Sequence, residues 1–183
     1  MELKVTMLAR KAIFSGRVFE VTRDEVLLPD GRPGIRELVH SHGGVVILPV
    51  DEQGNVTLVH QFRYAQDRVL LEAVAGKLEP GEEPLPAAKR ELREETGFTA
   101  DRWTDLGWIC TSPGFLTERL YLYLAEGLHP GEQQLDPGEF LHCETMPLKE
   151  LGRRIAEGLV EDGKTLAIYL KAILRERKGE DHG

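Results

Sequence analysis

The chain has 183 residues, of which 41% are hydrophobic and 30% are charged. This composition excludes an intrinsically disordered chain and allows a sizeable core. The formal net charge of −8 argues against nucleic acid or a membrane surface as a partner held by bulk electrostatics. An anionic substrate would need local positive charge, which bound metal ions can supply.

Two features concern the compartment in which the protein acts. Cys110 and Cys143 form no Cys-x-x-Cys pair and no ligand cluster, which is the pattern of reduced thiols in a cytosolic protein. The N-terminus lacks the long apolar run of a signal peptide, and no stretch approaches the ~18 apolar residues of a membrane span. We therefore expect a soluble cytoplasmic protein without a membrane or nucleic-acid partner.

The first 42 residues predict a small antiparallel sheet. Residues 12–28 (AIFSGRVFEVTRDEVLL) indicate two short strands, and Pro29-Asp30-Gly31 is a turn signal. Residues 35–42 alternate apolar and polar side chains, as a half-buried strand does. A segment this short lies at the ~40–60-residue limit for an independent core. We therefore expect it to pack on a second copy of the chain.

The next elements are strands followed by one helix. Residues 45–50 (VVILPV) form a continuous apolar run typical of a buried strand, and residues 56–63 and 70–74 predict two more. Residues 84–96 (PLPAAKRELREET) predict a helix, because prolines are tolerated in a first turn and Gly97 stands where a C-terminal cap belongs.

The rest of the chain alternates strands, loops and helices. Residues 103–109 and 120–125 predict strands around a loop at residues 111–117, and residues 127–139 predict an exposed loop rich in Gly, Pro and acid. Residues 148–157 and 164–178 predict helices, and residues 178–183 a frayed tail. The predicted fold is α/β, a mixed (α+β) sheet covered by helices, with a catalytic domain over residues 43–177.

The segment at residues 76–98 (GKLEPGEEPLPAAKRELREETGF) carries the chemistry. Glu91, Glu94 and Glu95 stand at i, i+3 and i+4 and share one face of the predicted helix. A merely solvated face would interleave basic residues, whereas here the acids cluster and Glu82 adds a fourth from the preceding loop. Hard oxygen ligands grouped in this way suit Mg²⁺, with Mn²⁺ as the alternative.

This segment resembles the Nudix box: Gly, five residues, Glu, seven residues, Arg-Glu-aliphatic, one residue, Glu-Glu, one residue, Gly-aliphatic. Phe98, in the last aliphatic position, is a mild departure. The resemblance implies a Nudix-type α/β/α sandwich and a metal-dependent pyrophosphohydrolase. It implies that the Ala75 carbonyl, Glu91 and Glu95 bind metal, that Glu94 assists, and that Arg90 orients a glutamate. The matching fixed positions are Gly76, Glu82, Arg90, Glu91, Glu94, Glu95 and Gly97.

Three segments outside the box resemble the ADP-ribose pyrophosphatase branch. Pro113 follows Phe98 by fifteen residues, Arg63 ends a strand ahead of the box, and residues 36–39 (RELV) match a segment that contacts the adenosine end of the substrate in that branch. Each also has a structural explanation, as a loop proline, a surface charge or an amphipathic edge strand, although an arginine fork suits a diphosphate. The substrate-binding residues implied by the resemblance are Arg36, Glu37, Arg63, Glu82 and Gly114.

The general base is the least determined residue. In the branch a glutamate on a loop after the box has this role, and it aligns with Glu139, although Asp136 and Glu132 are close enough to compete. The segment LDPGEF has fewer acids than the branch, and Val74 stands where the branch often has proline. Gly131 and Gly138 are candidate hinges for closure of the loop.

The resemblance implies hydrolysis of ADP-ribose to AMP and ribose 5-phosphate by a homodimer, with residues 1–42 helping to build the adenosine pocket of the partner. Two alternatives stay open. The same chemistry can act on another nucleoside diphosphate derivative, such as a nucleotide sugar or a dinucleotide. A non-catalytic ADP-ribose sensor is the second, although a pure sensor need not keep every metal carboxylate.

Overall fold

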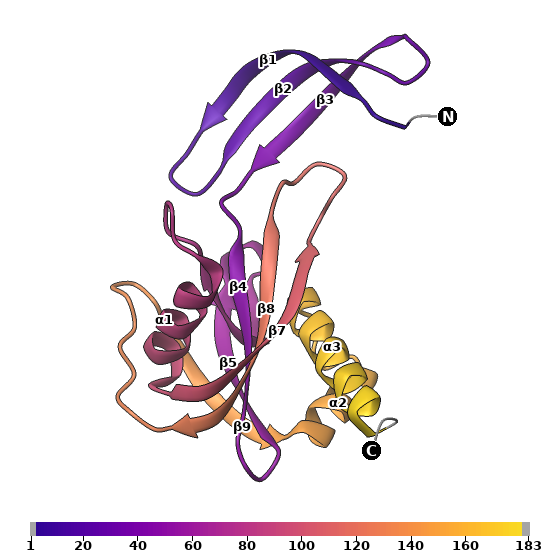
Figure 1. Cartoon of the computed structure of the whole chain (residues 1–183). Coiled ribbons are helices and arrows are strands. Elements are labelled where there is room, and N and C mark those ends of the chain that lie inside the picture. The colour runs from indigo at the N-terminus through magenta and orange to yellow at the C-terminus, as the bar shows by residue number, and fades with distance from the viewer. Residues whose placement is uncertain (1–2, 181–183) are drawn as a thin grey trace. The chain divides into compact units, whose positions relative to one another are not determined.

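The computed structural model describes residues 3–180, and side chains through residue 175. The chain divides into two compact units (Figure 1). The first contains the residues up to Gly43 together with Cys110–Arg119, and the second contains Gly44–Ile109 and the chain from Leu120 onward. The segment 110–119, which follows a strand of the second unit in sequence, thus belongs to the first.

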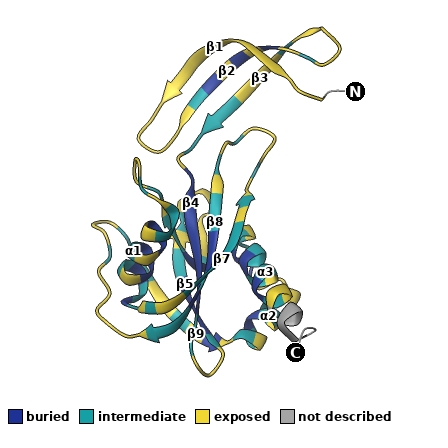
Figure 2. Ribbon diagram, viewed as in Figure 1, coloured by how far each residue is buried: buried dark blue, intermediate teal, exposed yellow. Residues whose placement is uncertain are grey.

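The first unit is a three-stranded antiparallel sheet with the order β1-β2-β3. Its strands are β1 (Thr6–Ser15), β2 (Glu20–Leu27) and β3 (Pro33–His40). In β2, Thr22, Asp24 and Val26 are buried and alternate with exposed residues, while all of β1 is exposed (Figure 2). The predicted antiparallel sheet is confirmed, but β1 begins six residues before the predicted start at residue 12. No buried apolar residue marks β1, and the main-chain ladder to β2 defines it.

The loop at residues 111–117 is attached to the end of β3. Val39 donates its main-chain N–H to the Phe115 carbonyl at 2.8 Å, and Thr117 donates to the Val39 carbonyl at 3.0 Å. The Ser41 amide donates to the Thr117 hydroxyl at 3.2 Å. These bonds extend the first unit beyond its three strands and give the loop a fixed course.

The second unit is a six-stranded mixed sheet with the order β7-β8-β4-β6-β5-β9. β4 pairs in parallel with β8 and antiparallel with β6, and β5 pairs antiparallel with β6 and β9. Helix α1 covers one face, and α2 and α3 cover the other (Figure 1). The elements are β4 (Gly44–Val50), β5 (Asn55–Arg63), η1 (Tyr64–Gln66), β6 (Arg68–Lys77), α1 (Pro84–Thr96), β7 (Thr99–Cys110), β8 (Arg119–His129), β9 (Leu141–Pro147), α2 (Leu148–Ala156) and α3 (Gly163–Glu180).

β4 explains why the sandwich forms. Val45 and Ile47 face a cluster that includes Leu92 of α1, whereas Val46 and Leu48 face a cluster that includes Ile168 of α3. A strand covered on both faces needs an unbroken apolar run, and this is the pattern of residues 45–50. The predicted mixed sheet covered by helices is confirmed.

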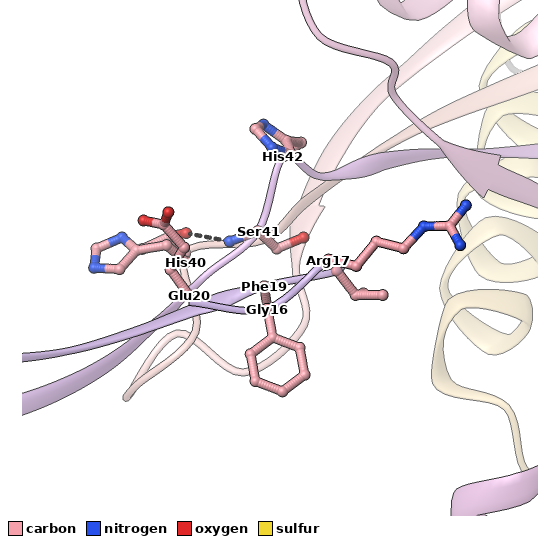
Figure 3. Close-up of a pocket in the computed structure, with 9 residues that line it drawn as sticks. Gly16, Arg17, Phe19, Glu20, His40, Ser41 and His42 are labelled. Atoms are coloured by element: carbon pink, nitrogen blue, oxygen red, sulfur yellow. Dashed lines mark hydrogen bonds between the residues drawn. The ribbon is translucent and has the colours of Figure 1, made fainter. Parts of the chain in front are cut away.

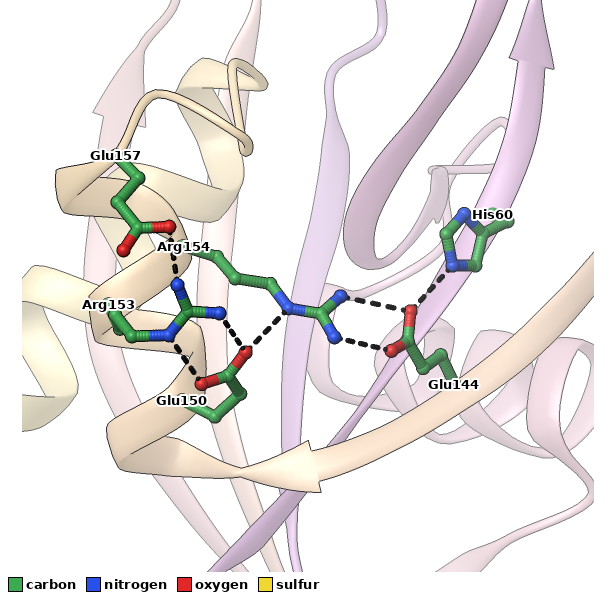
Figure 4. Close-up of polar contacts among 6 residues, drawn as sticks. All are labelled: His60, Glu144, Glu150, Arg153, Arg154 and Glu157. Atoms are coloured by element: carbon green, nitrogen blue, oxygen red, sulfur yellow. Dashed lines mark hydrogen bonds and ion pairs between the residues drawn. The ribbon is translucent and has the colours of Figure 1, made fainter.

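β9 is an edge strand that periodicity did not predict. Of its seven residues only Met146 is buried, so no alternating pattern marks it. Side chains attach it to its neighbours instead: Glu144 accepts hydrogen bonds from His60 at 2.7 Å and from Arg154 at 2.9 Å (Figure 4). Arg154 also donates to Glu150, so a polar network joins β5, β9 and α2.

The C-terminal helix α3 extends to Glu180, two residues beyond the predicted end at Lys178. The remainder of the predicted frayed tail, residues 181–183, lies outside the described residues. Among the helices of the described part of the chain, none is both long and apolar enough to cross a membrane.

Candidate active site

Helix α1 supports the site, and its bounds are those that the sequence predicts. Pro84 is its first residue, and Gly97 ends it with φ 76°, a left-handed conformation that glycine adopts without strain. The helix buries one stripe of side chains against the sheet, and this stripe includes two glutamates. The buried residues are Ala87, Ala88, Glu91, Leu92 and Glu95.

The two buried glutamates lie against the end of β6. The Ala75 amide donates to Glu95 Oε2 at 3.3 Å, and the Glu91 carboxylate occupies the space in which a Cβ on residue 76 would stand. Gly76 is part of strand β6, and the close approach of the Glu91 carboxylate requires a glycine there. Gly81, with φ 80°, permits the turn before the helix.

Arg90 is the polar centre of the box. Its guanidinium donates to both oxygens of Glu82, at 3.0 and 2.9 Å, to Glu91 at 2.8 Å and to Glu94 at 2.9 Å. It also donates to the Lys77 carbonyl at 3.1 Å. These contacts are those expected of a residue that orients glutamates. Through Glu82 they also connect the loop before α1 to the helix.

Burial dominates the ionisation of the two helix glutamates. It raises the pKa of Glu91, with Arg90 acting in the opposite direction. Burial and the negative charge of Glu91 raise the pKa of Glu95 to about 8, although the Ala75 amide and Arg63 oppose the shift. Glu95 is only 2% exposed. A buried carboxylate held in this way is stabilised by a nearby cation.

The donor set fits a divalent cation. Hard oxygen ligands, namely the Glu91 and Glu95 carboxylates beside the Ala75 main chain, are what Mg²⁺ and Mn²⁺ prefer. A glycine at position 76 leaves the room that Glu91 needs there. Within the described residues no group of three acidic, His or Cys side chains is arranged so that it could hold a cation. In this arrangement Arg90 donates hydrogen bonds to carboxylate oxygens of both Glu91 and Glu94.

Glu139 lies in the same unit and close to this pair. Its negative charge contributes to the raised pKa of both Glu91 and Glu95. Its main-chain N–H donates to the Asp136 carbonyl at 2.9 Å, which forms a turn at the end of the loop. Of the two candidate hinges, Gly131 packs closely on Gly97, whereas Gly138 has φ 95° and open surroundings. The structure thus brings Glu95 to Ala75 and Glu91 to Gly76, with Glu139 near enough to act on both carboxylates through its charge.

Arg63 is held by a residue that the motifs did not indicate. Its Nε and Nη2 donate to the two oxygens of Glu72 at 2.7 and 2.6 Å, and Lys164 of α3 also pairs with Glu72. Glu72 is 1% exposed, and these two cations outweigh burial and lower its pKa. A lone acid within the apolar strand RVLLEAVAG was the available signal, because a buried charge needs partners.

The first turn of α3 accepts a hydrogen bond from β6 next to Glu72. The ladder between β4 and β6 ends at the pair Ile47 and Val74. The next amide of β6, that of Ala73, donates instead to the Thr165 hydroxyl at 2.7 Å. The first turn of α3 thus brings Lys164 to Glu72.

The remaining predicted residues belong to the first unit. Arg36 and Glu37 are exposed on β3, and Gly114 lies in the loop beside it. This unit also has a pocket of about 300 Å³, lined in part by Phe19, Arg17 and His40. Figure 3 shows the Arg17 and His40 side chains extending in opposite directions.

Comparisons with known proteins show the family to which the chain belongs. The model of the NUDIX domain matches residues 40–169. The chain therefore belongs to the Nudix hydrolase family and is a pyrophosphohydrolase, as the box predicts. Hydrolases of this family generally need divalent metal ions.

The chain is similar in sequence to three relatives that have different names. It is 39% identical to an ADP-ribose pyrophosphatase of Bacillus subtilis (strain 168), over 96% of this chain and 98% of the relative. It is 38% identical to a methanol dehydrogenase activator of Bacillus methanolicus, over 84% of each chain. It is 33% identical to a GDP-mannose pyrophosphatase of Yersinia pestis (strain Pestoides F), over 73% of this chain and 72% of the relative.

A solved structure agrees on the fold. The chain resembles a crystal structure described as ADP compounds hydrolase, with a TM-score of 0.83 and 21% identity, over 97% of this chain and 96% of that one. The predicted Nudix fold is confirmed by this likeness.

Proposed function

We propose that this Nudix hydrolase cleaves the diphosphate bond of ADP-ribose to AMP and ribose 5-phosphate with Mg²⁺, and that Mn²⁺ can replace Mg²⁺. The observation that carries the proposal is that two buried glutamates meet the end of β6, Glu95 at the Ala75 amide and Glu91 at Gly76, with the charge of Glu139 acting on both. The likeness over nearly the full chain to an ADP-ribose pyrophosphatase supports this choice of substrate.

We assign metal binding, proton transfer and the orientation of the glutamates to different residues. Glu91, Glu95 and the Ala75 carbonyl would hold the cation, with Glu94 assisting. When bound, it neutralises phosphate oxygens and lowers the pKa of a bound water. Glu139 accepts the proton of the attacking water, because a carboxylate engaged in metal binding is a poor base. Arg90 keeps the box glutamates in place through its four side-chain hydrogen bonds.

Arg63 is the proposed ligand of the diphosphate. Glu72 takes its Nε and Nη2, so the Nη1 side remains for a phosphate oxygen, and the side chain is 39% exposed. The assignment of Arg36 and Glu37 to the adenosine end, and of Glu82 and Gly114 to the substrate, rests on the resemblance in sequence.

The decisive assay mixes the protein with Mg²⁺ and one of several diphosphates, and separates the products. ADP-ribose should give AMP and ribose 5-phosphate with the highest kcat/KM of a panel that includes GDP-mannose and NADH. A higher kcat/KM for a nucleotide sugar or a dinucleotide would establish the alternative substrate class. Binding of ADP-ribose without turnover would make the protein a sensor.

The base is tested by three loop variants: Glu139→Gln, Asp136→Asn and Glu132→Gln. Only the first should lose kcat, by about 100-fold or more, because general-base catalysis contributes 10²–10⁴-fold. Mn²⁺ affinity should stay unchanged, since this glutamate is not a proposed ligand. If Asp136→Asn is the variant that loses activity, the base is Asp136, and if all three are active the base lies in the box.

We also propose that the active protein is a cytoplasmic homodimer. The sheet of the first unit supports this, because it leaves large apolar side chains exposed, among them Leu8, Ile13 and Phe14 at 59%, 54% and 52%. Contiguous exposed apolar surface is typical of an interface. Sedimentation at micromolar concentration should give twice the chain mass, and a fully active monomer would contradict the proposal.

A further inference from the structure

The loop that carries Glu139 is fastened to the C-terminal end of α1. The last carbonyls of a helix have no partner within it. Here the Glu94 carbonyl accepts the Gln134 amide at 2.9 Å, and the Glu95 carbonyl accepts Gln133 Nε2 at 2.5 Å. A carbonyl oxygen only accepts, so the Gln133 carboxamide must direct its NH₂ group to the helix.

Residues 131–133 of this loop also pack closely on Gly97, at the end of α1. A Cβ on Gly97 would meet the Gly131 carbonyl oxygen at 2.5 Å and the Gln133 nitrogen at 2.9 Å. Residues 131–134 therefore cannot swing away from α1 without breaking both hydrogen bonds. This excludes Gly131 as a free hinge.

The chain is held again a few residues later. Leu141 packs against the apolar cluster under α1 and pairs with Gln61 of β5. Residues 135–140 thus form a short bridge with both ends fixed, and Glu139 lies within it, half-buried. The position of Glu139 relative to α1 depends on how firmly each end is held.

We propose that Gln133 is a positioning residue for the hydrolysis: its side chain holds the bridge 135–140 against the end of α1 and so fixes Glu139 beside the attacking water. The inference rests on the proposed function, in which Glu139 is the base. Gln133 itself contacts a main-chain carbonyl of the helix and no reacting atom. A misplacement of about 1 Å can cost about 100-fold in rate, so a contact of this kind matters to catalysis.

The test compares Gln133→Leu with Gln134→Leu. Leucine at position 133 removes the donor, while Cys143 Sγ, 3.4 Å from the Glu95 carbonyl, still contacts that oxygen and helps preserve the fold. Gln134 is exposed, its side chain has no hydrogen bond among the described residues, and its main-chain bond survives substitution. In Gln133→Leu we expect kcat with ADP-ribose to fall by about 10- to 100-fold, with KM and Mn²⁺ affinity little changed. Gln134→Leu should stay close to the wild type.

A double variant separates positioning from general weakening of the helix. In the Glu139→Gln background, Gln133→Leu should cause no further loss of kcat. Gln133 acts by placing the base, so its loss has no effect once the base has been removed. A full additional loss, or a parallel loss of Mn²⁺ affinity, would overturn the proposal. So would a Gln133→Leu enzyme as active as the wild type when Glu139→Gln is inactive. If Glu139→Gln is itself active, the assignment of the base fails first, and the role of Gln133 fails with it.

Discussion

Glu95 on α1 and Glu72 on β6 are two glutamates of the same unit with almost the same exposure, 2% and 1%. Burial, together with the negative charges of Glu91 and Glu139, raises the pKa of Glu95 to about 8. Burial acts on Glu72 in the same direction, yet Arg63 and Lys164 hold its pKa below the ordinary value. The difference between the two sites therefore lies in their partners.

Glu95 is thus a carboxylate for which we propose metal binding, whereas Glu72 is ion-paired within the chain. Glu72 is an ion-paired group whose partners belong to the chain, so its charge is satisfied in the folded protein. Glu95 has a main-chain amide and like-charged neighbours, an arrangement that costs stability unless a cation arrives from solution. Removal of each carboxylate should therefore have opposite consequences.

The largest effect is expected from Glu95→Gln. This change keeps the size of the side chain and removes the charge of a proposed metal ligand. Turnover of ADP-ribose should fall at least about 100-fold, because a metal ion supplies several kcal/mol of transition-state stabilisation. Thermal unfolding without metal should be as for the wild type or at a higher temperature. Near-normal turnover at saturating Mg²⁺ would remove Glu95 from the site.

Glu72→Gln should act mainly on stability. It leaves Arg63 and Lys164 without their buried carboxylate, and breaking such a pair costs about 2–4 kcal/mol, with the partial exposure of Arg63 moderating the loss. Urea unfolding measures this change. Glu144→Gln is the matched control: its half-exposed carboxylate also pairs with an arginine, and its loss should cost less than about 1 kcal/mol. Equal losses in the two variants would contradict the comparison.

Arg63→Ala should lower kcat/KM. The loss of transition-state stabilisation should be about 1.5–3 kcal/mol, as expected for a charge-assisted contact to the diphosphate. Arg63→Lys should rescue little, since lysine cannot reproduce the two-bond contact with Glu72 that orients the side chain. Steady-state kinetics with ADP-ribose measures both. If Arg63→Ala loses stability and keeps kcat/KM, this arginine serves only Glu72.

The smallest effect concerns acid pH. The pKa of Glu72 is lower in the folded chain than its ordinary value of 4.5. Its contribution to stability is therefore present above pH 4.5 and is lost as the pH falls through the lowered folded pKa. The difference in unfolding free energy between wild type and Glu72→Gln should shrink from about pH 6 to about pH 3. A difference that stays constant over this range would mean that Glu72 does not titrate as described.

Local signals carried much of the fold. The run 45–50, the helix 84–96 and the Gly97 cap each depend on residues within one element, and the structure places them where predicted. β9 could not be predicted in the same way, because its residues are largely exposed and the ladder to β5 defines it. The attachment of residues 110–119 to β3 likewise depends on contacts distant in sequence.

The sequence by itself determined the helix that carries Glu91, Glu94 and Glu95 on one face, since helical periodicity, proline and glycine act over a few residues. Only the tertiary structure decided which carboxylates are paired. Glu72 receives Lys164 from 92 residues away, and α1 receives Gln133 at its end, 38 residues beyond the carbonyl that it caps. The ionisation of a buried acid depends on desolvation and on charges brought near by folding, and neither is present in the local sequence pattern.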